Sequence, residues 1–149
     1  MTKDVLVAIK GLQSATDEEA GNIQTITVGE YYKRNEHHYV IYDEAEEETG
    51  QSTRNIIKFG ENSLELTRKG LINVHMVFEE NKKNLTNYST PFGDILIGID
   101  ARKVTVQDEE DNIHVEVEYA LEANYEFLSE CRISMDISKR EAGVVEALF

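Results

Sequence analysis

The chain has 149 residues, which is enough for one domain with a sizeable core and too few for two comfortable ones. Its formal net charge of -14 repels phosphate backbones and anionic lipid surfaces, so neither nucleic acid nor a membrane is an expected partner. No apolar run approaches the ~20 residues of a membrane-spanning helix, and the first residues lack a signal-peptide pattern, so we expect a cytoplasmic protein.

Apolar residues recur at every second position along most of the chain, which is typical of strands with one buried face. In chain order the expected strands are Asp4–Leu12, Ile23–Lys33, Tyr39–Glu44, Ile56–Phe59, Leu64–Arg68, Val74–Glu79, Leu85–Thr90, Phe92–Val106, Ile113–Ala123 and Phe127–Ile137. Short polar segments such as GENS and EANYE separate them and favour hairpin turns. Only the C-terminal SKREAGVVEALF could form a short helix, and its glycine disfavours even that.

The last two expected strands alternate most clearly. One face of the first carries Ile113, Val115, Val117, Tyr119, Leu121 and Ala123, and the other face carries His114, Glu116, Glu118 and Glu122. In the second, the apolar positions are Phe127, Cys131, Ile133, Met135 and Ile137. This pattern predicts an antiparallel hairpin with long arms and with Asn124 in its turn.

A change of parity marks the long strand Phe92–Val106. It follows the only proline, Pro91, which suits a strand entry because proline cannot donate to a sheet ladder. Its apolar face begins as Ile95, Ile97, Ile99 and Ala101 and continues as Val104 and Val106. Since a shift of one residue reverses every side chain, the sequence predicts a β-bulge near Ala101–Lys103.

Many sequential strands with short turns favour an all-β fold, a single closed antiparallel up-and-down β-barrel of about eight to ten strands. Closure removes the exposed edges that such long strands would otherwise present. A sandwich of two sheets is the alternative. We expect residues 1–138 to form the barrel domain and residues 139–149 to form a C-terminal tail.

The segments GEYYKRNEHHYVIYDE, FGENSLELTRKG, TPFGDILIGIDARKV and EVEYALEANYEFLSECRISMDIS occur in this order. As an ordered set they resemble the YwiB-like family of small bacterial proteins, over nearly the whole chain up to about Ser138. The resemblance implies a calycin-like, lipocalin-type barrel in the bacterial cytoplasm. It implies no activity and no catalytic residues, because the function of that family is unknown. Calycin relatives often hold small apolar ligands, but fold analogy alone is a weak argument for ligand binding.

Five residues are candidates for contact with a ligand inside the barrel. Arg68 shares a face with Leu64 and Leu66, so it should point inward near a strand end and could pair with a carboxylate or phosphate. The alternative is a rim arginine paired with an acidic neighbour. The other candidates are Asn55 and Tyr119 on inward parities, Tyr39 in a tyrosine-rich hairpin, and Arg102, whose direction the expected bulge leaves open.

No metal, cofactor or catalytic constellation is expected. His37 and His38 are adjacent and face opposite sides of a strand, while His114, Glu116 and Glu118 share one face without the spacing of a metal motif. Cys131 alternates with core residues, and as the single cysteine it fits a reducing compartment. An enzyme is therefore the least favoured class of function.

Two functions compete. The first is a barrel that binds a small apolar or anionic ligand. The second is a structural or interaction module whose barrel is filled with side chains and whose outer surface meets a protein partner. The inward set is rich in bulky residues, which favours a partly filled interior. A homodimer is compatible with the sequence.

Overall fold

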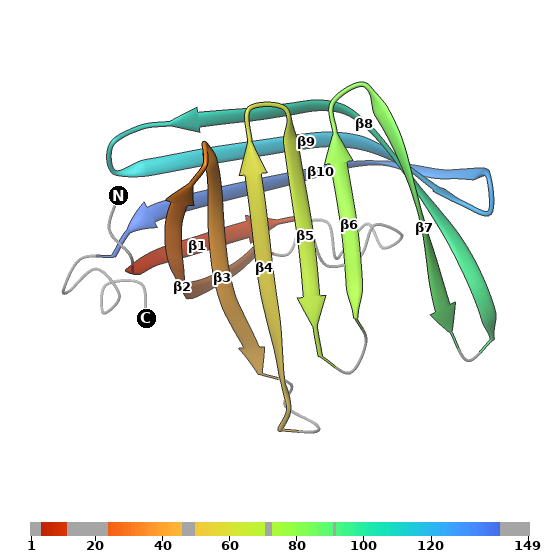
Figure 1. The fold of residues 1–149 in the computed structure, drawn as a ribbon, viewed down its shortest axis with the longest axis horizontal. Coiled ribbons are helices and arrows are strands. Elements are labelled where there is room, and N and C mark those ends of the chain that lie inside the picture. Colours follow the sequence, from red (N-terminus) through yellow and green to blue (C-terminus); the bar gives the residue numbers. More distant parts are fainter. Residues whose placement is uncertain (1–3, 12–23, 46–49, 71–72, 91, 141–149) are drawn as a thin grey trace.

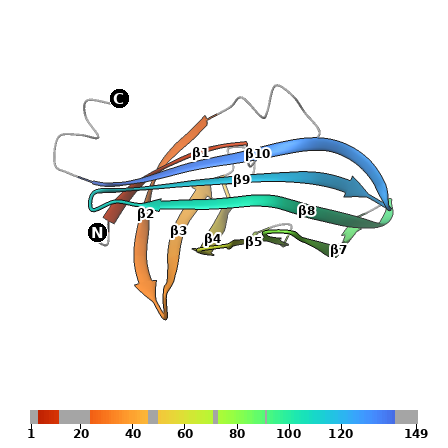
Figure 2. The ribbon, with the colours of Figure 1, turned by 90° about the horizontal axis from the view of Figure 1, so that it is seen from above.

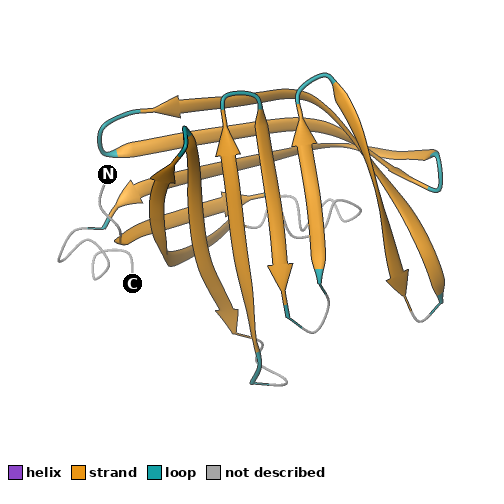
Figure 3. Cartoon of the chain, viewed as in Figure 1, coloured by secondary structure: helices purple, strands orange, loops and turns teal. Residues whose placement is uncertain are grey.

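Alternating apolar residues build strands throughout the part of the chain that this computed structural model describes, residues 4–11, 24–45, 50–70, 73–90 and 92–140. The strands are β1 Asp4–Lys10, β2 Gln24–Arg34, β3 His37–Ala45, β4 Ser52–Gly60, β5 Ser63–Lys69, β6 Val74–Glu79, β7 Lys82–Thr90, β8 Gly93–Asp108, β9 Asn112–Ala123 and β10 Glu126–Lys139. No helix occurs in these residues (Figure 3). The short helix was considered for SKREAGVVEALF, residues 138–149; Ser138 and Lys139 belong to β10 instead, and residues 141–149 lie outside the described part.

The strands form one ten-stranded antiparallel sheet in the order β6-β5-β4-β3-β2-β1-β10-β9-β8-β7. Apart from β6 and β7, consecutive strands pair with each other, and β1 also pairs with β10, from Val5 opposite Lys139 to Lys10 opposite Ser134. The two strands at the ends of the order, β6 and β7, are joined by a short turn, but no ladder pairs their described residues. The expected up-and-down barrel is thus confirmed as a nearly closed barrel.

The sheet curls so that two sets of strands cross over a common core. Strands β8, β9, β10 and β1 run along one side, and β2 to β6 cross them on the other (Figures 1 and 2). Inward side chains of both sets fill the space between them, as in orthogonal packing of sheets. The largest fully buried ones are Phe59, Phe78, Leu64, Leu66, Ile99, Ile113, Met135 and Ile137.

Tight turns that contain residues with a left-handed backbone connect several of the strands. Asn35 and Glu36 have φ of 51° and 66°, and Asn124 and Tyr125 have φ of 50° and 68°. Positive φ at both central residues is the mark of the type I′ turn, whose twist matches that of the strands it joins. The turn expected at Asn124 is therefore confirmed.

The β-bulge expected in β8 is confirmed. Ala101 pairs with Tyr119 and Lys103 pairs with Glu118, so Arg102 is the extra residue. Both Ala101 and Val104 are buried, as the change of parity requires.

A second register shift, in β10, corrects one expectation. The ladder between β10 and β9 shifts between Phe127 and Ser129, so Leu128 is the additional residue there. Phe127 was expected on the buried face, but the shift turns it outward and its side chain is 61% exposed. Ile133, Met135 and Ile137 lie beyond the shift and are buried as expected.

Candidate functional site

A row of polar side chains crosses three neighbouring strands on the inner face of the barrel. Tyr42 in β3 lies opposite Asn55 in β4, and Asn55 lies opposite Arg68 in β5. They point inward because each lies two positions from a buried apolar residue of its own strand, namely Val40, Ile57 and Leu66. We call Tyr42, Glu44, Asn55 and Arg68 the Arg68 site.

Glu44 ties this row together through one carboxylate oxygen. Asn55 Nδ2 donates to Glu44 Oε1 over 2.9 Å, and Arg68 Nη2 lies 3.5 Å from the same oxygen. The side chains of Arg68 and Glu44 are 26% and 30% exposed. The inward direction expected for Arg68 is therefore observed, and so is the acidic partner considered as its alternative.

The buried phenol of Tyr42 responds to both charges of the site. Burial raises its pKa, Glu44 raises it further, and Arg68 opposes the shift. The hydroxyl therefore keeps its proton at neutral pH and serves as a neutral hydrogen-bonding group beside an ion pair.

Asn55 carries the most unusual atom of the site. The residue is 0% exposed, and its Oδ1 has no hydrogen-bond partner. A buried carbonyl oxygen without a donor costs ~1–3 kcal/mol, so native proteins rarely leave one unpaired. Asn84 Nδ2, in β7, is a second buried atom without a partner in the described part of the chain.

An open pocket adjoins the site. It has a volume of about 340 Å³ and is lined by Thr67, Arg68, Lys69, Asn73, Val74 and His75. These residues end β5 and begin β6, at the bottom of the sheet in Figure 1. Arg68 thus lines the pocket and also contacts Glu44, which connects the pocket to the buried polar row.

The structure does not bring the other sequence candidates to this site. Tyr119 is a core residue whose ring meets Phe78 edge-on at 4.8 Å. Tyr39 lies on the outer face of β3, where it stacks on Tyr32 at 4.8 Å. Arg102 is exposed at the bulge.

Arg102 also has a charged partner of its own. Its Nη1 lies 2.8 Å from Glu130 Oε1 on the outer face. The bulge therefore settles the direction that the sequence left open, and Arg102 lies away from the barrel interior.

Sequence reasoning missed a second polar group inside the barrel. The Tyr31 hydroxyl and His38 Nδ1 are 2.6 Å apart, and His38 Nε2 lies 3.7 Å from Asp108 Oδ2. The imidazole also stacks on Phe59 at 4.8 Å. Burial lowers the pKa of His38 despite the opposing Asp108, and burial raises the pKa of Tyr31.

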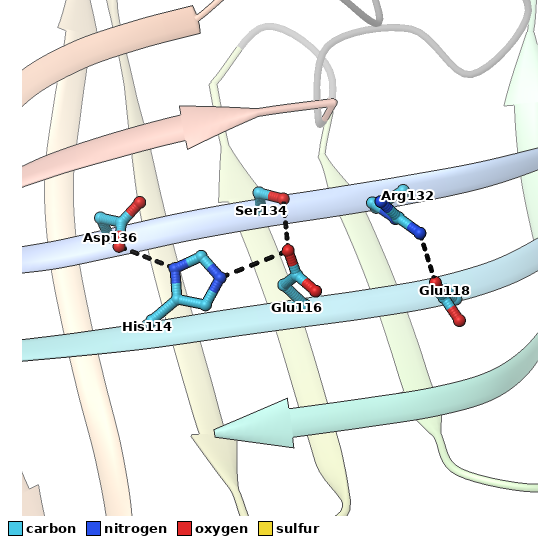
Figure 4. Close-up of polar contacts among 6 residues, drawn as sticks. All are labelled: His114, Glu116, Glu118, Arg132, Ser134 and Asp136. Atoms are coloured by element: carbon cyan, nitrogen blue, oxygen red, sulfur yellow. Dashed lines mark hydrogen bonds and ion pairs between the residues drawn. The ribbon is translucent and has the colours of Figure 1, made fainter. Parts of the chain in front are cut away.

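The outer face of β9 and β10 carries a third network, shown in Figure 4. His114 Nδ1 lies 2.7 Å from Asp136 Oδ1, and its Nε2 lies 3.3 Å from Glu116 Oε1. Arg132 Nη2 lies 2.6 Å from Glu118 Oε1. The His114–Asp136 and Arg132–Glu118 contacts thus join β9 to β10, while the contact of His114 with Glu116 lies within β9. In the described residues no group of three or more His, Cys, Asp or Glu side chains could hold a metal ion.

The ten antiparallel strands form a nearly closed barrel, an architecture consistent with the calycin-like class of folds. A family profile described as "Domain of unknown function (DUF1934)" matches residues 7–135, and the chain belongs to that family. The crystal structure of the YwiB protein from Bacillus subtilis has a TM-score of 0.68 and 17% sequence identity, over 93% of each chain. The YwiB-like resemblance of the sequence is thereby confirmed, and at this identity the likeness shows the fold alone. No curated protein matches the chain. Among the described residues, no helix has the length and apolarity to cross a membrane.

Proposed function

We propose that this protein binds a small molecule at the Arg68 site, with the ligand entering through the adjoining pocket. The observation that carries the proposal is the position of Arg68, which is one of the residues lining an open pocket and whose guanidinium contacts Glu44. A half-buried guanidinium with one weak contact keeps most of its donors for a ligand anion. The middle of the barrel is filled by side chains such as Phe59 and Leu66, which favours a site at the end of the barrel.

Native mass spectrometry and titration test this proposal. We expect the full-length protein purified without denaturation to carry a small bound mass, or to give NMR shifts near Arg68 on addition of inorganic phosphate, hexanoate or an amino acid. R68M should abolish this binding. R102M should retain it, because Arg102 is also an ion-paired arginine but lies on the outer face. A bare mass together with no response to any probe would overturn the proposal.

A filled barrel that docks a protein is the second candidate. It is favoured by an outward row in which Leu85 lies opposite Gly98, Gly98 opposite Glu122, and Glu122 opposite Phe127. Leu85 and Phe127 are both exposed at the two ends of this row. Light scattering after size exclusion distinguishes self-association there: a dimer that F127E converts to a monomer would support this candidate. The acidic charge and the presence of a single cysteine in the sequence support a cytoplasmic location, which cell fractionation tests.

A further inference from the structure

We propose that the ligand of the Arg68 site is an α-amino acid, held by its carboxylate at Arg68 and by its ammonium between Glu44 and Asn55. This inference rests on the proposed function and specifies the class of small molecule. The ligand must carry a hydrogen-bond acceptor for Arg68 and, a few bonds away, a hydrogen-bond donor for Glu44 and Asn55.

The ammonium half follows from unused acceptors. Asn55 Oδ1 is buried and has no donor, while Asn55 Nδ2 is already committed to Glu44. Glu44 receives both of its contacts in the site at Oε1, which leaves Oε2 free within the described residues. An ammonium group offers three donors and no acceptor, so it can serve a carboxylate and an amide oxygen together. A ligand without such a donor leaves the buried oxygen of Asn55 unpaired.

The carboxylate half follows from the donors of Arg68. Only Nη2 has a contact in the site, 3.5 Å from Glu44. That distance is too long for a strong hydrogen bond. A guanidinium presents five donors in a planar fork that matches a carboxylate with two parallel bonds. A ligand carboxylate at Arg68 would therefore form stronger hydrogen bonds than the present contact with Glu44.

The charge of the site selects between a zwitterion and a simple ion. Arg68 and Glu44 carry opposite charges, so the net charge of the pair is zero. Both side chains are partly shielded from solvent. A plain anion would face Glu44, and a plain cation would face Arg68, with unfavourable electrostatics in either case. A zwitterion pairs with both and keeps the site neutral. The pocket of about 340 Å³ next to Arg68 provides volume for its side chain.

The probes for the test are the twenty standard amino acids, added to the full-length protein and followed by amide NMR shifts and calorimetry. For the tightest binder, two analogues are then compared: the deamino acid, which keeps only the carboxylate, and the decarboxylated amine. We expect both analogues to bind at least about tenfold more weakly than the amino acid, since each loses one charged hydrogen-bond set.

Matched variants assign the two halves. N55L removes the acceptor Asn55 Oδ1 without removing either charge. It should therefore weaken binding of the amino acid by about tenfold and change binding of the deamino acid little. N84L is the control, because Asn84 also has a buried atom without a partner but lies in β7. The thermal unfolding midpoint of each variant separates loss of binding from loss of folding.

The outcomes separate the two proposals. Binding of the deamino acid as tight as that of the amino acid would overturn the zwitterion inference and leave ligand binding at Arg68 intact. The same conclusion follows if hexanoate or phosphate binds in an Arg68-dependent way and no amino acid does. Absence of any binding overturns both, while amino-acid binding that N55L and N84L weaken equally contradicts the role given to Asn55.

Discussion

The hydroxyl of Tyr31 and the Nδ1 of His38 form a 2.6 Å hydrogen bond inside the barrel, on neighbouring strands β2 and β3. The buried ring of His38 stacks on Phe59. Its two nitrogens have one polar contact each, Nδ1 with Tyr31 and Nε2 with Asp108. Because the ring is neutral when buried, the Tyr31 hydroxyl is the donor that its unprotonated nitrogen needs.

Y31F removes that donor and leaves a buried nitrogen unsatisfied. We expect the free energy of unfolding to fall by ~1–3 kcal/mol, measured by urea denaturation. Y32F is the control, because Tyr32 is exposed on the other face of the same strand and should change stability by less than ~0.5 kcal/mol. Equal losses in the two variants would contradict the role of the buried hydrogen bond.

The buried His38 should make the fold sensitive to acid. Burial lowers its pKa below the ordinary value of 6.5, so the unfolded chain takes up this proton before the folded chain does. The contribution of His38 to stability is therefore lost as pH falls through that ordinary value toward the lowered one. An NMR titration of the imidazole should give a midpoint below 6.5. A midpoint at or above it would show that the ring is solvated or more strongly paired than the structure indicates.

His114 should act in the opposite direction. Its hydrogen bond to Asp136 raises its pKa above 6.5, with a further contribution from Glu116. The contribution of His114 to the free energy of unfolding is therefore complete below pH 6.5 and is lost as pH rises through the raised pKa. H114Q should lower the unfolding midpoint at about pH 5.5 and leave it nearly unchanged at about pH 9. In D136N the raised midpoint of His114 should move back toward its ordinary value.

Substitution of Gly11 tests a close approach of two backbones. Gly11 has φ of 90°, and an added Cβ would overlap the carbonyl oxygen of Arg132 in β10. Gly50 has φ of 71° with nothing within 4 Å of an added Cβ, so G50A isolates the cost of the left-handed backbone, ~1–2 kcal/mol. G11A should cost clearly more than G50A in urea denaturation. Equal losses of stability would mean that the chain at Gly11 can move away from β10 at little cost.

Single deletions test the bulge in β8. Deletion of Arg102 should be tolerated, because Ala101 and Lys103 already occupy successive places opposite Tyr119 and Glu118. Deletion of Thr105 should prevent folding, because it reverses Val106 relative to its partner Val115. Far-UV circular dichroism and thermal unfolding of the two variants provide the comparison.

Much of this fold could be predicted because period-two alternation is a local property. The face of Arg68 followed from Leu64 and Leu66, and the bulge followed from the parity change between Ala101 and Val104. The face of Phe127 was predicted wrongly because the register shift at Leu128 lies near the start of β10. No other apolar residue of the strand precedes Phe127, so the sequence shows no change of parity there. A parity argument needs residues on both sides of an irregularity.

The partners within the sites were less predictable. Glu44 shares the parity of Tyr42, so alternation places both side chains on the same face of the strand. Its contacts with Asn55 and Arg68 depend on the register of three strands, which alternation does not fix. Asp108 reaches His38 from the far end of β8, a pairing set by the curvature of the whole sheet.

The barrel has two discontinuities, and they lie at different places. Between β1 and β10 the covalent chain does not continue, yet a backbone ladder joins the strands. Between β6 and β7 the ladder is missing over the described residues, yet the chain itself makes the turn, held by bonds from Glu80 N to Asn62 O and from Asn81 N to Ala101 O. A ladder thus joins the strands where the covalent link is absent, and the covalent chain joins them where the ladder is absent. A peptide-bond cut in the β6–β7 turn would leave neither a ladder nor a covalent link between these two strands, whereas a cut between Glu61 and Asn62 would leave the β4–β5 ladder to join its strands.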